Sequence, residues 1–114
     1  MKEIRVAIES HVLHLPKSAL ARLNSNEEVS REELIELAKD KNWYIRASVA
    51  KNPKTPKEIL EILAKDEDWI VREAIAKNLN TPKEILEILA RDKDENVRET
   101  AMNMQYFLIS KKIH

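Results

Sequence analysis

Apolar residues recur along this chain at spacings of three and four positions, which is the pattern of helices with one buried face. The stretches 59–64 and 85–90 both read ILEILA, and each is followed by a second apolar stripe. In one such stripe Val71 and Ile75 stand four residues apart and so share a helix face. The pattern predicts two helices in each unit and an all-α protein.

The first helix of each unit is preceded by residues that favour a helix start. Residues 55–58 and 81–84 both read TPKE. In this capping box the Thr hydroxyl accepts from the helix, Pro takes the first helical position and Glu reaches back. Residues 30–33, SREE, form a weaker version. The second helix is predicted to begin near three matching residues that are able to cap it: Asn42, Asp68 and Asp94.

The first helix has a wide apolar face. Over 58–65 only Glu58, Glu61 and Lys65 are polar, so Ile62 is expected to be buried together with its neighbours. A face this wide predicts that the helix is covered on two sides.

The chain contains no glycine, which affects how its helices end. Helices often finish in a left-handed residue, and Asn is the best substitute for Gly in that conformation. Asn52 and Asn78 stand at the ends of the second helices. We therefore expect both to be left-handed and to have a structural role.

The two predicted helices belong to a unit that repeats every 26 residues. Its copies read LAKDKNWYIRASVAKNPKTPKEI over 37–59, LAKDEDWIVREAIAKNLNTPKEI over 63–85 and LARDKDENVRETAM over 89–102. A fixed period of this length predicts an array in which each unit buries its apolar face against the next.

The array is expected to form a single domain over 1–114, with about three to four two-helix repeats. Residues 1–29 are predicted to be a degenerate N-terminal repeat or cap, in an alignment register that the sequence leaves open. Regular repeats follow over 30–104, and 105–114 are expected to be a C-terminal cap in which the last helix runs on through Ile109. Atypical end units are expected because an array must cover its end faces.

The pattern LAxDxxxxVRxxxAxNxxTPxEIL over 63–86 resembles the variant leucine-rich repeat. The spacing of six between Asp66 and Arg72 is also similar to that of HEAT repeats. The resemblance covers about 30–104 and implies a right-handed solenoid of helix pairs, one helix of which can be 3₁₀, that serves as a scaffold. A prototype of the variant repeat family carries a cysteine-bound iron–sulfur cluster. That function does not transfer, since this chain has no cysteine.

Composition excludes several classes of function. Twenty basic and twenty acidic residues give the 114-residue chain a formal charge of zero, so bulk electrostatics predict no polyanion partner. The lack of cysteine favours a reducing compartment, and no stretch has the length and apolar character of a membrane span. We expect a cytoplasmic protein that does not enter a membrane.

No motif for chemistry or cofactor binding is present. There is no Gly-rich phosphate loop and no cysteine nucleophile. His11 and His14 are three residues apart, but no third metal ligand is fixed beside them. We therefore predict that the protein is not an enzyme and has no metal or cofactor.

An acid and a base recur at the same positions of every unit. Such a row can be a catalytic or phosphate-binding array, or, as the resemblance to HEAT repeats implies, a ladder that links one unit to the next. A reaction needs one site, whereas every copy has the pair, so we favour the structural ladder. Its members are Asp40, Asp66 and Asp92 with Arg46, Arg72 and Arg98.

Trp43 and Trp69 occupy the same position in successive units, and Glu95 replaces them in the third. Aromatic residues at repeat positions most often fill the seam between units. A pair on one edge can also grip a peptide or stack on bases. Both interpretations stay open, and the two tryptophans are candidate binding residues.

The loops that join units are rich in lysine, whereas the opposite turns are rich in acid. Lys57 and Lys83 oppose the dipole of the helix that they begin, which favours an acidic ligand at this edge. The alternative is that they pair with Glu61 and Glu87 four residues on. The candidate binding lysines are Lys51, Lys54, Lys57, Lys77 and Lys83.

The leading hypothesis is a non-enzymatic interaction scaffold that binds a protein or peptide along its repeat surface. A second is binding of nucleic acid or another phosphate ligand along the lysine-rich edge. A third is a structural or oligomer-forming subunit, in which residues 106–109, YFLI, form an apolar end through which copies associate. The chain is expected to be a monomer or a weak homo-oligomer.

Overall fold

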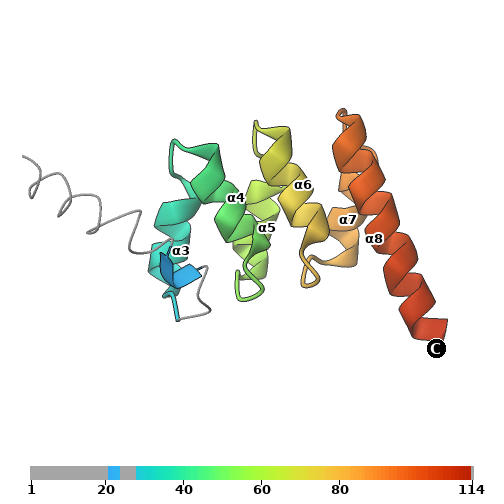
Figure 1. Cartoon of the computed structure of the whole chain (residues 1–114), viewed down its shortest axis with the longest axis horizontal. Helices are drawn as coiled ribbons and strands as arrows, with labels where there is room; N and C mark the ends of the chain where they lie inside the picture. The colour runs from blue at the N-terminus through green and yellow to red at the C-terminus, as the bar shows by residue number, and fades with distance from the viewer. Residues whose placement is uncertain (1–20, 24–27, 114) are drawn as a thin grey trace, which may run out of the picture.

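The computed structural model describes residues 21–23 and 28–113, and this part of the chain contains helices and turns but no strand. The prediction of an all-α protein is thus confirmed over these residues. The helices form a row (Figure 1). They are α3 (Arg31–Ala38), α4 (Trp43–Lys51), α5 (Lys57–Leu63), α6 (Trp69–Lys77), α7 (Lys83–Leu89) and α8 (Glu95–Ile113).

The second helix of each unit begins where its capping residue predicts. The carboxamide of Asn42 accepts from the backbone N–H of Tyr44 at 2.9 Å, and the carboxylate of Asp68 accepts from that of Ile70 at 2.9 Å. Each bond satisfies one of the N–H groups that a helix start leaves without a partner. Asp94 likewise accepts from the N–H of Asn96 at 2.8 Å, next to the start of α8.

The capping box predicted before α5 and α7 is wrong. Pro56 and Pro82 themselves stand at the N-cap, and no side chain caps either helix. The Thr55 hydroxyl instead donates backwards to the carbonyl of Val49, at 2.6 Å, and Thr81 makes the matching bond in the next unit. Each threonine thus closes the end of the preceding helix. The weaker box at 30–33 does form, between Ser30 and Glu33.

The prediction of left-handed asparagines is also wrong. Asn52 and Asn78 have φ of −69° and −76° and extended backbones. Each side chain accepts from the N–H two residues on, that of Lys54 or Asn80, so a side-chain turn ends the helix without a positive φ. Asn78 also joins two units, because its amide donates to the carbonyls of Ala50 at 2.8 Å and Asn52 at 3.0 Å.

Equivalent helices of successive units lie side by side. Helix α4 packs along α6, and α6 packs along α8, while α5 and α7 pack against the helix that follows each of them. The core between these rows is apolar, and Leu60 and Leu86 are fully buried in it. The expected burial of the first helices on two sides is wrong, since Ile62 is 64% exposed. One face of α5 and of α7 is therefore open to solvent.

The two ends of the row of helices differ. Helix α8 runs on from Glu95 to Ile113, because the loop residues that end α4 and α6 are absent there. At the other end Leu23 is buried at the position that Val49 and Ile75 occupy one and two units later. Most of the predicted N-terminal unit over 1–29 lies outside the described residues, as does residue 114 of the predicted C-terminal cap.

Candidate functional site

The repeated acids and bases join one unit to the next. The Nε and Nη2 atoms of Arg46 donate to the two carboxylate oxygens of Asp66 at 2.8 and 3.1 Å. Arg72 binds Asp92 with the same distances. Each arginine also donates from Nη1 to the carbonyl of the aspartate in its own unit, at 2.6 Å for Arg46 and 2.7 Å for Arg72. One guanidinium thus fastens the turn of its own unit to the turn of the next.

The aspartates of this ladder have a second task within their own turns. The Asp92 carboxylate accepts from the N–H of Asp94 at 2.8 Å as well as from Arg72. Burial works against ionisation of Asp92, but the hydrogen bonds from Arg72 and Asp94 and the charge of Arg72 outweigh it, so its pKa is lowered. The hydrogen bond with Asp66 raises the pKa of Arg46 further. The arginines and aspartates of the ladder are thus hydrogen-bonded to one another, as a structural link requires.

Arg98 is the last arginine of the ladder among the described residues. Arg98 donates to the carbonyl of Asp92 at 2.8 Å, as its counterparts do. No carboxylate of the described residues lies within ion-pair distance of it. At the other end, Asp40 accepts from the N–H of Asn42 at 2.8 Å and pairs with no arginine of the described residues.

Trp43 and Trp69 do not fill the core, since they are 42% and 38% exposed. Trp43 contacts Tyr44 edge to face, with ring centroids 5.9 Å apart. Trp43 and Tyr44 line a groove of about 500 Å³ that follows the exposed side of α4, whereas Trp69 is not part of its lining. Its lining is Leu23, Trp43, Tyr44, Ala47, Ser48, Lys51, Asn52, Pro53 and Ile70.

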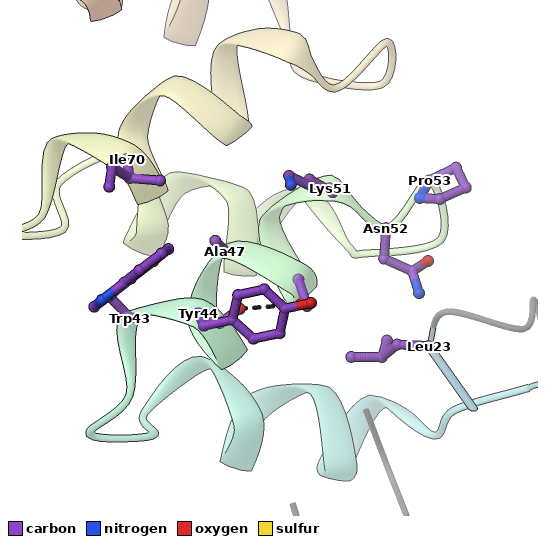
Figure 2. Close-up of a pocket in the computed structure, with 9 residues that line it drawn as sticks. Leu23, Trp43, Tyr44, Ala47, Lys51, Asn52, Pro53 and Ile70 are labelled. Carbon is purple, nitrogen blue, oxygen red and sulfur yellow. Dashed lines mark hydrogen bonds between the residues drawn. The ribbon is translucent and has the colours of Figure 1, made fainter. Parts of the chain in front are cut away.

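Figure 2 shows how the lining of this α4 groove is arranged. Trp43 and Ile70 lie at one end, where α4 meets α6, and the Tyr44 ring lies in the middle. Asn52 and Pro53 lie at the opposite end. The small side chain of Ala47 is buried beneath the surface and leaves the groove open. The groove therefore has aromatic side chains at one end and in its middle, and Leu23, Asn52 and Pro53 at the other end.

The predicted binding lysines are all exposed. Lys51 lines the α4 groove, and Lys54 lies in the loop before α5. Lys57 and Lys83 are the first residues of α5 and α7. Neither Lys57 nor Lys83 forms an ion pair with a described residue, so the expected pairs with Glu61 and Glu87 are absent. Lys77 does pair, with Glu73 at 3.5 Å.

The sequence analysis missed several lining residues. Tyr44 and Ile70 each follow a tryptophan and match one another across the 26-residue period. That shared position next to Trp43 and Trp69 is the signal that points to them. Asn52, for which the sequence predicts a structural role, also lines the groove.

Comparisons with protein-family models, with curated proteins and with solved structures find no match for this chain. No family is therefore assigned to it, and the functional argument rests on its own residues.

The described part of the chain contains no group of three or more potential metal ligands. His11 and His14 lie outside the described residues. Among the described helices, none combines the length and the apolar character needed to cross a bilayer.

Proposed function

We propose that this chain is a non-enzymatic interaction module of the variant leucine-rich or HEAT-like kind, in which about three to four 26-residue units form a right-handed solenoid. The side-by-side packing of α4, α6 and α8, one period apart, supports this arrangement. So do the bonds that recur between successive units, such as those of Arg46 and Arg72. The absence of cysteine favours work in the cytoplasm.

The module binds a short acidic segment of a partner protein in the α4 groove. The observation that carries this proposal is the exposure of Trp43 and Tyr44 at a groove whose lining also includes Lys51. Aromatic side chains supply much of the binding energy at interfaces. Lys51 has no ion-pair partner among the described residues and is available to a carboxylate.

The size of the groove sets the length of the ligand. Helix α4 has nine residues and is about 13 Å long. An extended chain advances about 3.3 Å per residue, so the groove holds roughly four residues. We expect an apolar or aromatic side chain against Trp43 and an acidic one near Lys51.

A selection from a random peptide library displayed on phage tests this function with the full chain as bait. We expect the enriched peptides to combine an aromatic residue with an acid three or four positions away. Their affinity should fall at least about tenfold for Trp43→Ala or Lys51→Glu. Tyr106→Ala, which removes an exposed aromatic residue outside the groove, is the matched control. Binders that are indifferent to Trp43 and Lys51 would contradict the proposal.

The alternative of a phosphate-bearing ligand is favoured by one observation: Lys54, Lys57 and Lys83, in the loop before α5 or at the first residue of α5 and α7, form no ion pair with a described residue. Against it, the turn at 66–68 carries three acids directly before Trp69, so a longer polyanion would be repelled there. Tryptophan fluorescence with added single-stranded RNA at about 50 mM salt distinguishes a nucleic-acid ligand from a peptide ligand. A response that disappears steeply as salt is raised would favour nucleic acid over peptide.

A further inference from the structure

The ladder of arginines is left open at its C-terminal end. Arg46, Arg72 and Arg98 each donate from Nη1 to the carbonyl of their own unit's aspartate, at 2.6, 2.7 and 2.8 Å. This shared bond holds the three guanidinium groups in the same way. In the first two, the Nε and Nη2 edge binds the carboxylate of the next unit. In Arg98 that edge has no carboxylate partner among the described residues.

The surface of α8 beside Arg98 corresponds to a buried seam elsewhere in the chain. Met102 stands 26 residues after Ala76 and 52 after Ala50, both of which are completely buried. Met102 itself is 50% exposed. Tyr106 and Ile109, four and seven residues further on, extend the same side of α8 and are exposed as well. An apolar stripe thus lies where a following helix would pack.

A cleft beside this stripe gives the end face its shape. It measures about 650 Å³ and lies between α7 and α8. Ile88 and Met102 provide apolar walls, and Glu84, Glu87, Arg91 and Gln105 provide the polar part. The end face therefore combines an apolar surface, a concave site and an arginine prepared to bind a carboxylate.

We propose that this end face docks a helix of a partner protein that carries an aspartate in the turn before its first residue. The requirement follows from the bonds that Asp66 and Asp92 make inside the chain. Each accepts from the N–H two residues on, at 2.9 and 2.8 Å, while it binds the arginine of the preceding unit. An aspartate in the same kind of turn places its carboxylate against the Nε and Nη2 edge of Arg98. The apolar side of the helix that follows it then covers Met102.

A second copy of this chain fits the end face less well than a helix with such an aspartate. Among the described residues, Asp40 is the one ladder aspartate whose carboxylate has no arginine partner, and a head-to-tail copy would have to bind through it at the opposite end of the row. That end is already covered by Leu23, which is buried where Val49 and Ile75 are buried in later units. The docked helix is therefore assigned to a different protein. This site is separate from the α4 groove and does not depend on it.

The test uses the ¹⁵N-labelled full chain and a synthetic peptide of its own residues 65–80, KDEDWIVREAIAKNLN, which contains Asp66 and α6. This peptide reproduces the element that covers α4 and whose Asp66 binds the Nε and Nη2 atoms of Arg46. We expect NMR shift changes at Arg98 Nε–H and at the amides around Met102. Affinity should fall at least about tenfold when the peptide carries Asp66→Asn or the chain carries Arg98→Ala.

The control variant is Lys93→Ala, which removes an exposed cation close to Arg98 and should leave the affinity unchanged. Shift changes confined to α4 would mean that the peptide replaces α6 in the array, and they would overturn the proposal. So would the absence of any change around Met102, or equal binding of the Asp66→Asn peptide. Shifts at Arg98 that depend on the concentration of the chain alone would identify a second copy as the occupant and also overturn it.

Discussion

Arg72 shows how one side chain can hold two units together. It is 6% exposed, it binds both carboxylate oxygens of Asp92, and it fixes the carbonyl of Asp66. A buried ion pair contributes little net stability over a well-packed apolar pair, but removal of one partner leaves the other buried and uncompensated. The energetic importance of the ladder therefore appears when it is broken.

Replacing Arg72 by Ala should lower the free energy of unfolding by about 3–5 kcal/mol, because Asp92 would stay buried without its partner. Arg98→Ala is the matched control, since Arg98 has no carboxylate partner among the described residues, and we expect a loss of about 1 kcal/mol. Urea unfolding followed by circular dichroism measures both. Equal losses of unfolding free energy in the two variants would show that the bond between Arg72 and Asp92 adds nothing to stability.

The lowered pKa of Asp92 predicts how stability depends on pH. A carboxyl whose pKa is lower in the folded state than in the unfolded state stabilises the fold above the unfolded value. That contribution should be complete above the ordinary value of 3.8 and disappear as pH falls through the folded-state pKa. Unfolding free energies measured between pH 7 and pH 2 test this, with Asp92→Asn expected to reduce the acid-induced loss. If the loss of stability began near neutral pH, a group other than Asp92 would be responsible for it.

At the scale of single elements, the junctions between helices carry more than the sequence pattern reveals. The loop from α6 to α7 contains Asn78 and Thr81, both buried, and each donates to a backbone carbonyl of an earlier residue. The Asn78 amide thus satisfies the carbonyl of Ala50 near the end of α4, and Thr81 adds a second donor to the Ile75 carbonyl, which also accepts from the N–H of Asn78. The loop is a fixed connection rather than a simple spacer.

Asn78→Ala should destabilise the protein by about 1–3 kcal/mol, since the buried carbonyl of Ala50 would lose the amide that bonds it across the unit boundary. Asn52→Ala removes the same kind of helix-ending turn, but the Asn52 amide donates to no carbonyl of the described residues. We therefore expect a smaller loss in Asn52→Ala. Thermal unfolding of the two variants compares them directly, and a reversed order would refute the bridging role of Asn78.

The buried and the exposed side of α5 should respond differently to substitution. Leu60→Ala should cost about 2–5 kcal/mol because Leu60 is completely buried. Ile62→Gln, two residues away on the same helix, should change stability by less than about 0.5 kcal/mol. Chemical unfolding of both variants would distinguish one-sided from two-sided burial. A large loss in Ile62→Gln would require a partner surface over this side of α5.

Sequence reasoning identified the period, the helix class and the caps at Asn42 and Asp68, because these depend on residues close in the chain. It failed for Thr55, since a hydroxyl can accept from the following helix or donate to the preceding one, and only the position of the Val49 carbonyl decides. It also failed for Ile62, because an apolar pattern does not show how many neighbours a helix has. The α4 groove was found only in part, as Ile70 joins it from a different unit.

At the scale of the whole molecule, the units are not equally supported. Helix α6 packs between α4 and α8, and five of its nine residues are buried. Helix α8 is covered on the α6 and α7 side alone, and after Ala101 it has no fully buried residue over 102–112. In a stacked array, stability is roughly a sum over units and their interfaces. The ends of the row should therefore open before its centre.

Native-state hydrogen exchange measures this gradient directly. We expect the slowest amide exchange in α6, at Val71 and Ile75, which are completely buried between two neighbouring units. Amides over 106–112 should exchange much faster, because only Met104 and Leu108 of the last turns pack partly against the core. A partner helix on the end face would slow exchange there without altering α6. If the free protein already protected 106–112 as strongly as α6, the end face would have to be covered in the isolated molecule, contrary to the exposure of Tyr106 and Ile109.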